Sequence, residues 1–152
     1  MSEIGFYHLT LSGPDQALPK LLERTLALNE RALVLCTVIE RVDALDTALW
    51  LCQNPVWLPH GTARMGEADL QPIWMTAAAE DAAKPPNGAR FLFLIDGADV
   101  ADLSHFSRVF DLFDGNDEGA LGAARKRWAA AKAAGHTLSY WKQGARGWER
   151  GP

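Results

Sequence analysis

The chain has 152 residues, of which 48% are hydrophobic and 22% are charged, and its formal net charge is −4. This length and balance indicate one soluble globular domain with a sizeable core, and no apolar run approaches the ~20 residues that a membrane-spanning helix needs. The first ten residues lack the basic start and apolar stretch of a signal peptide, so we expect a cytoplasmic protein. Cys36 and Cys52 both lie in apolar runs, which indicates two buried thiols rather than a disulfide or a metal pair.

Charge is distributed unevenly along the chain. From Arg125 to the C-terminus seven cations stand against one acid, a net charge of +6, whereas residues 1–124 carry a net charge of −10. A basic end on an acidic body predicts a local anion-binding surface. General nucleic-acid-binding domains are usually basic throughout, so we expect no strong direct binding to nucleic acid.

Strands and helices are expected to alternate along the chain. Strands are predicted where β-forming apolar residues run together, and helices where apolar residues recur at intervals of three and four. In chain order we predict a strand over 4–9, a helix over 18–29, a strand over 31–38, a helix over 40–51, short strands over 57–58 and 73–75, a strand over 90–96, helices over 103–113 and 118–135, and a strand over 137–142. Residues 61–71 and 77–87 are predicted loops, because the first is polar and the second ends in Pro-Pro-Asn-Gly.

This alternation predicts a single α/β domain over residues 1–143, with three layers and an open, mostly parallel sheet. Residues 144–152 are basic and glycine-rich, so we expect a flexible C-terminal tail there. The segment after the first strand, HLTLSGPDQALPK, contains one glycine and neither GxGxxG nor Gly-Lys-Ser/Thr. We therefore predict no nucleotide-binding loop.

The predicted helix over 118–135, EGALGAARKRWAAAKAAG, carries an unusual stripe. Leu121, Arg125, Trp128 and Lys132 follow one another at intervals of four, three and four residues, which aligns them on one side of a helix. The alanines leave a small-residue face that can lie close to a sheet. An indole between two cations suits a surface that binds a partner; the alternative is a half-buried core tryptophan beside solvated cations.

Catalytic patterns are sparse in the sequence. Four histidines are scattered, and GxSxG does not occur. Asp96, Asp99 and Asp102 follow the strand predicted over 90–96, at a sheet edge where α/β enzymes keep their sites. They are compatible with a small nucleotide- or metal-binding enzyme, but a turn and a helix start explain them more simply. We therefore expect a binding protein with no cofactor, no metal and no catalytic residues.

Several stretches, taken in order, resemble the chi subunit of bacterial DNA polymerase III. They are FYHL, RALVLC, VDALDTALW, WLPHG, PIW, RFLFLIDGA, FSRVFDLFD, ARKRW and AGHTLSYWK, and they extend to about residue 142. The resemblance implies a Rossmann-like sheet without a nucleotide site and a non-catalytic accessory role in the clamp loader. It also implies two partners. One is the acidic C-terminal tail of single-stranded DNA-binding protein, and the other is a psi subunit that links chi to the clamp loader.

The resemblance assigns tail-binding roles to residues of the helix over 118–135. Arg125 matches the family's key arginine, which would hold the tail's terminal carboxylate. Trp128 stands where the family usually has tyrosine, and it would wall a pocket for the tail's terminal aromatic ring. Lys132 stands where the family usually has arginine and would attract the tail's acids, whereas Ala129 stands where a basic residue is common.

Three further residues receive roles in the same way. Lys126 would add long-range attraction for the tail, and Phe113 would form the floor of its pocket. Trp57 matches the aromatic position that the family uses against psi; the alternative is that it covers the edge of the sheet.

Overall fold

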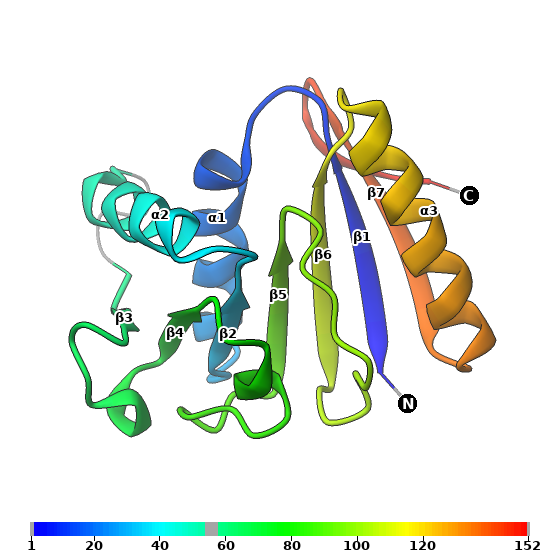
Figure 1. Cartoon of the computed structure of the whole chain (residues 1–152). Helices are drawn as coiled ribbons and strands as arrows, with labels where there is room; N and C mark the ends of the chain where they lie inside the picture. The colour runs from blue at the N-terminus through cyan, green and yellow to red at the C-terminus, as the bar shows by residue number, and fades with distance from the viewer. Residues whose placement is uncertain (1, 54–57, 152) are drawn as a thin grey trace.

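The computed structural model describes residues 2–53 and 58–151 (Figure 1). Within this part, eight strands form one open sheet in the order β3-β4-β2-β5-β6-β1-β7-β8. The strands are β1 (Glu3–Leu9), β2 (Ala32–Leu35), β3 (Gly61–Thr62), β4 (Ile73–Thr76), β5 (Phe91–Ile95), β6 (Arg108–Asp114), β7 (Thr137–Gly144) and β8 (Gly147–Arg150). The helices are α1 (Pro14–Ala27), α2 (Ile39–Leu51) and α3 (Glu118–Ala133).

All neighbouring strands are parallel except β7 and β8, which form an antiparallel hairpin. The inner strands β2, β4 and β5 are buried along their whole length. Strands buried on both faces need continuous apolar sequence, which is the pattern that predicted them. The fold class predicted from the sequence, an open and mostly parallel α/β sheet, is confirmed.

The three helices divide between the two faces of the sheet, which gives three layers (Figure 1). Helices α1 and α2 pack on one face, over side chains such as Val34, Phe93 and Phe110. Helix α3 packs on the other face, where small side chains, Ala124 and Ala131, are buried against the sheet. Loop residues 96–107, which join β5 to β6, also cover part of this second face.

Residues 108–114 form strand β6, and the predicted helix over 103–113 is wrong. Val109, Phe110, Leu112 and Phe113 are all buried, because β6 lies between β5 and β1 with a covered face on each side. A strand of this kind shows no alternation of apolar and polar residues, so its aromatic spacing imitates a helix. In the predicted helix, Asp111 would face solvent. In strand β6 it is instead buried and paired with an arginine of α3.

The C-terminal segment also differs from the flexible tail expected over 144–152. Residues 147–150 form β8 and pair with β7. Gly147 has a φ of 112°, a backbone conformation that favours glycine and permits the tight turn into β8. The Trp148 ring lies edge-on to Tyr7, with 5.0 Å between ring centroids, so pairing with β7 and the packing of one aromatic side chain order a segment of polar composition.

Two predicted loops contain short ordered elements. Residues 61–71 include β3 and a 3-10 turn, η1 (Ala68–Leu70), and residues 77–87 include a second one, η2 (Ala79–Ala82). The strand predicted over 57–58 lies partly outside the described residues. Across 2–53 and 58–151, no helix combines the length and the apolar character that crossing a membrane requires.

Candidate functional site

Helix α3 begins and ends as its sequence predicts. The Asp117 side chain accepts a hydrogen bond from the backbone N–H of Gly119 at 2.9 Å, which satisfies one of the free donors at the start of the helix. Gly135 follows the helix with a φ of 85°, as is common just beyond a C-terminus. Because its sheet-facing residues are alanines, α3 leaves room for a hollow along each of its sides.

The first hollow lies between α3 and strands β1, β6 and β7, and we call it the Trp128 hollow. Its volume is about 490 Å³. It is lined by Phe6, His8, Phe113, Leu121, Ala124, Arg125, Trp128 and Tyr140. Most of these side chains are apolar, so the hollow suits an apolar group, with a cation at its edge.

Trp128 and Arg125 provide the wall and the cation of this hollow. The Trp128 ring is half-buried and packs on Phe6, with 5.1 Å between ring centroids and a 60° tilt. Arg125 is exposed and has no acidic group within 4.0 Å in the described part of the chain. Its guanidinium is therefore available to an anion from outside.

His8 and Tyr140 complete the rim on the sheet side. His8 Nδ1 is hydrogen-bonded to the Tyr140 hydroxyl, and the His8 ring stacks on Phe113 at 5.2 Å and 26°. Burial raises the pKa of Tyr140, and the positive charge of Arg125 partly offsets this rise. Tyr140 and Arg125 thus line the same hollow.

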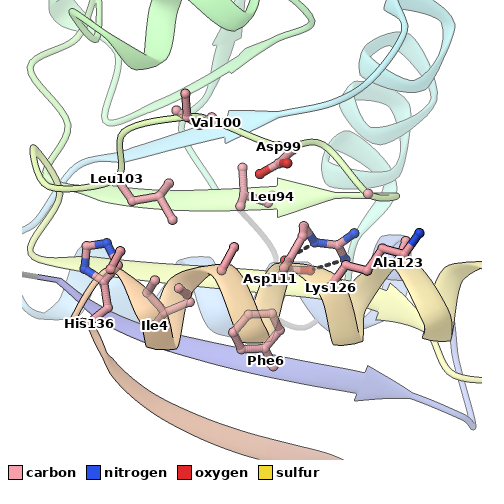
Figure 2. A pocket seen from close by; sticks show the side chains of 16 residues that line it. Ile4, Phe6, Leu94, Asp99, Val100, Leu103, Asp111, Ala123, Lys126 and His136 are labelled. Carbon is pink, nitrogen blue, oxygen red and sulfur yellow. Dashed lines mark hydrogen bonds and ion pairs between the residues drawn. The ribbon is translucent and has the colours of Figure 1, made fainter.

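The second hollow lies on the opposite side of α3, beneath loop 96–107, and we call it the Asp111 hollow (Figure 2). Asp111, with a side chain only 2% exposed, accepts two hydrogen bonds from Arg127, at 2.6 and 3.0 Å. Burial raises the pKa of Asp111, and the Arg127 guanidinium opposes that rise. Figure 2 shows Lys126 and Asp99 on opposite sides of this hollow, so cations and acids are balanced there.

The structure thus brings together only part of the site predicted from the sequence. Arg125, Trp128 and Phe113 line one hollow. Lys126 faces the Asp111 hollow instead, and Lys132 is exposed and lines neither hollow. Trp57, the residue expected to contact psi, lies outside the described residues.

The three aspartates of the alternative enzyme hypothesis have separate partners. Asp96 is paired with Arg41 at 2.6 Å, and Asp102 accepts hydrogen bonds from the backbone N–H and the hydroxyl of Ser104. Asp99 lies at the Asp111 hollow. In residues 2–53 and 58–151 no group of three His, Cys, Asp or Glu side chains is placed to hold a metal ion. The turn expected at 96–102 is present, but no helix follows it.

Several residues of the Trp128 hollow were not singled out by the sequence analysis. Phe6 and His8 alternate along β1 and therefore point to the same face of the sheet, and Tyr140 lies beside β1 on β7. The alternation was visible in FYHL, but strand order was needed to place Tyr140 there. His60 likewise has a carboxylate partner, Asp46, at 2.9 Å, which the sequence spacing did not reveal.

These features define a three-layer α/β domain with an open, mostly parallel sheet and a cation-edged apolar hollow beside one helix. Residues 1–139 match the family model described as DNA polymerase III chi subunit, HolC. The chain is also 25% identical, over 113 residues, to the "Probable DNA polymerase III subunit chi" of Rickettsia prowazekii (strain Madrid E). That match spans 74% of this chain and 66% of the relative, so the chain spans slightly less than two thirds of the relative's length.

The chain belongs to the DNA polymerase III chi subunit family, because the family model covers most of its length. The resemblance seen in the sequence is thereby confirmed. The family is named for a subunit of DNA polymerase III, which places its members among the proteins of DNA replication.

Proposed function

We propose that this protein binds the acidic C-terminal tail of single-stranded DNA-binding protein in the Trp128 hollow and so connects that protein to the DNA polymerase III assembly. One observation carries the proposal: Arg125, free of any acidic partner in the described chain, lies at the edge of an apolar hollow walled by Trp128. The family supports this class of assembly, and the lining of the hollow supports this location for the tail.

The chemistry of the tail fits the hollow. A terminal aromatic ring would pack among Trp128, Phe6 and Phe113, which line the same hollow. The Phe6 and Trp128 rings already pack on each other. The free carboxylate beside that ring would accept two parallel N–H bonds from the Arg125 guanidinium. Both groups belong to the last residue of the tail, so the hollow would recognise the end of a chain rather than an internal segment.

The affinity for the tail would come from two contributions, the ion pair with Arg125 and the burial of the terminal ring. An ion pair that stays exposed contributes only ~0–1 kcal/mol, and hydrogen bonds to a charged group contribute ~1.5–3 kcal/mol, whereas micromolar affinity corresponds to ~8 kcal/mol. Burial of the terminal ring must therefore supply much of the affinity. The exposed charges of Lys132 and Lys126 would mainly raise the association rate for the acidic tail, and they would do so less as salt increases.

The connection to the rest of the polymerase would run through a psi-like subunit. Trp57 is the residue that the family resemblance assigns to that contact. Residues 54–57 are not described, so this part of the proposal is supported by the resemblance alone.

Calorimetric titration with a synthetic tail peptide tests the tail-binding proposal. We expect Arg125→Ala to weaken binding about 10- to 100-fold, the range expected for losing a charge-assisted, two-bond contact. Amidation of the peptide's terminal carboxylate should cause a loss of similar size. Arg64→Ala is a matched control, because it removes the same charge from an exposed residue near the opposite edge of the sheet.

The interpretation depends on how the two changes combine. If Arg125 holds the carboxylate, Arg125→Ala and the amidated peptide together should weaken binding little more than either change alone. Unchanged affinity for Arg125→Ala, or losses that simply add, would place the terminal carboxylate elsewhere.

A further inference from the structure

Aromatic and arginine side chains form a row on the face of the sheet that carries α1, opposite α3. The row crosses five neighbouring strands, from β5 to β8. We call it the Tyr7 row, and it consists of Phe91, Arg108, Phe110, Tyr7, Trp141, Trp148 and Arg150. No function described above uses these residues.

Rings and guanidinium groups lie along the row at stacking distances from one another. The Arg108 guanidinium carbon lies 5.6 Å from the Phe91 ring centre and 5.0 Å from that of Phe110. Tyr7 stacks on Phe110 at 5.6 Å and on Trp141 at 6.2 Å, with ring planes within 29° and 11° of parallel. Arg150 lies over the outer side of the row, 5.6 Å from the Trp141 ring centre.

A groove of about 510 Å³ opens along this row, between α1 and the β7–β8 hairpin. Tyr7, Phe91 and Phe110 form its buried floor, whereas Trp141 and Trp148 are half-buried and present ring surface to it. The floor is held rigidly by the sheet, so the exposed rings need little ordering before they accept a flat ligand.

The groove is positively charged although the protein as a whole is acidic. Arg24 and Arg108 line it and Arg150 lies at its end, and none of the three has an acidic group within 4.0 Å in the described chain. Burial raises the pKa of Tyr7, the charges of Arg108 and Arg24 lower it, and Glu3 is the acid that raises it further. Cations therefore outnumber acids around the row.

We propose that this groove binds single-stranded DNA, with a base stacked on Trp148 or Trp141 and phosphates held by Arg24, Arg108 and Arg150. Half-exposed aromatic rings beside guanidinium groups are what a flexible polyanion with flat bases requires. A partner peptide would use the rings but would leave three cations without anions, which makes it the weaker candidate. The membership in a DNA replication family agrees with this ligand class.

We expect the groove to bind single-stranded DNA only weakly, because the protein as a whole is acidic. Three phosphate contacts on a single strand predict a log–log salt slope of about −2. Affinity should therefore fall roughly 20-fold between 50 and 200 mM salt. A general nucleic-acid-binding domain with many contacts would show a steeper dependence.

Fluorescence anisotropy of a labelled oligonucleotide of about 15 thymidines tests this groove. We expect the intact chain to bind at 50 mM salt, and Arg108→Gln and Arg150→Gln each to weaken binding several-fold and reduce the salt slope by about 0.7. Trp148→Leu should weaken binding about tenfold while changing the slope little, because it removes stacking and no charge. Thermal melting checks that each variant is folded. If another variant proves unfolded, Arg150→Gln still tests the proposal, because Arg150 lies on the exposed hairpin.

Arg64→Gln is the charge-matched control, since Arg64 is exposed and lies near the opposite edge of the sheet. Equal losses for Arg64→Gln and Arg108→Gln would show a diffuse charge effect and overturn the proposal. Absence of oligonucleotide binding at 50 mM salt would overturn it as well, and would leave the groove to a peptide. Arg125→Ala, on the other face, should leave oligonucleotide affinity unchanged.

Discussion

Gly115 shows how one small residue shapes the Trp128 hollow. A Cβ atom at this position would overlap the His8 ring and lie 2.9 Å from the Leu9 carbonyl oxygen. His8 cannot yield easily, because it stacks on Phe113 and is hydrogen-bonded to Tyr140. We predict that Gly115→Ala lowers the free energy of unfolding by about 1–3 kcal/mol, the range of overpacked cores, and also weakens binding of the tail peptide.

Urea unfolding and calorimetric titration measure both effects of Gly115→Ala. Gly122→Ala is the control, because nothing lies within 4 Å of the added Cβ there. It should stabilise α3 by up to about 1 kcal/mol and leave tail affinity unchanged. Normal stability and normal affinity of Gly115→Ala would contradict the view that the His8 ring is held firmly in place beside Gly115.

The Asp111–Arg127 pair is the second feature at the scale of single residues. Arg127→Met leaves a buried carboxylate without its partner, so we predict a loss of about 3 kcal/mol in unfolding free energy. The double variant Asp111→Leu/Arg127→Met should recover that loss and equal or exceed the original stability, since a buried pair seldom repays its desolvation. Urea unfolding of the single and double variants checks this, and an unstable double variant would contradict it.

The same pair predicts a pH dependence. Because burial raises the pKa of Asp111, the folded protein binds this proton more tightly than the unfolded chain does. Protonation of Asp111 therefore contributes most to the free energy of unfolding below the pKa of this group in the unfolded chain. That contribution is lost as pH rises through its pKa in the folded protein. The stability advantage of the double variant over the original chain should therefore grow as pH rises across that interval.

At the scale of elements, sequence patterns predicted those segments whose environment follows from local composition. Strands such as β5 and helix α3 were found because a continuous apolar run and an alanine-rich stretch with Asp117 before it each have one structural solution. Strand β6 was missed because its burial on two faces and the Asp111–Arg127 pair depend on other elements. Strand β8 was missed because its polar sequence shows no strand pattern, and its pairing with β7 and the contact of Trp148 with Tyr7 depend on other strands.

The candidate site divides in the same way. Arg125 and Trp128 were predictable because helical spacing fixes them relative to each other. Their neighbours Phe6, His8 and Tyr140 come from β1 and β7, whose adjacency is a property of the sheet order and not of either segment. Lys132 was placed correctly on the helical stripe, but only the packing of α3 shows that the hollow ends before it.

At the scale of the whole molecule, strand β7 connects the two proposed binding surfaces. Tyr140 faces the Trp128 hollow, and the next residue, Trp141, faces the groove along the Tyr7 row on the opposite side of the sheet. Layers that pack on a sheet lie about 10 Å from it, which is close to the Debye length at 0.1 M salt. An acidic tail on one face and a DNA strand on the other should therefore repel each other only weakly.

We predict that the protein binds the tail peptide and single-stranded DNA at the same time. Saturating tail peptide should change oligonucleotide affinity by less than about twofold at 0.1 M salt, with a somewhat larger effect at lower salt where screening is weaker. Anisotropy titrations of the labelled oligonucleotide with and without peptide measure this. Arg125→Ala, which should bind the peptide much more weakly, provides the reference at the same peptide concentration. Full competition between the two ligands would mean that they share one surface, because sites on opposite faces of a rigid sheet cannot exclude each other sterically.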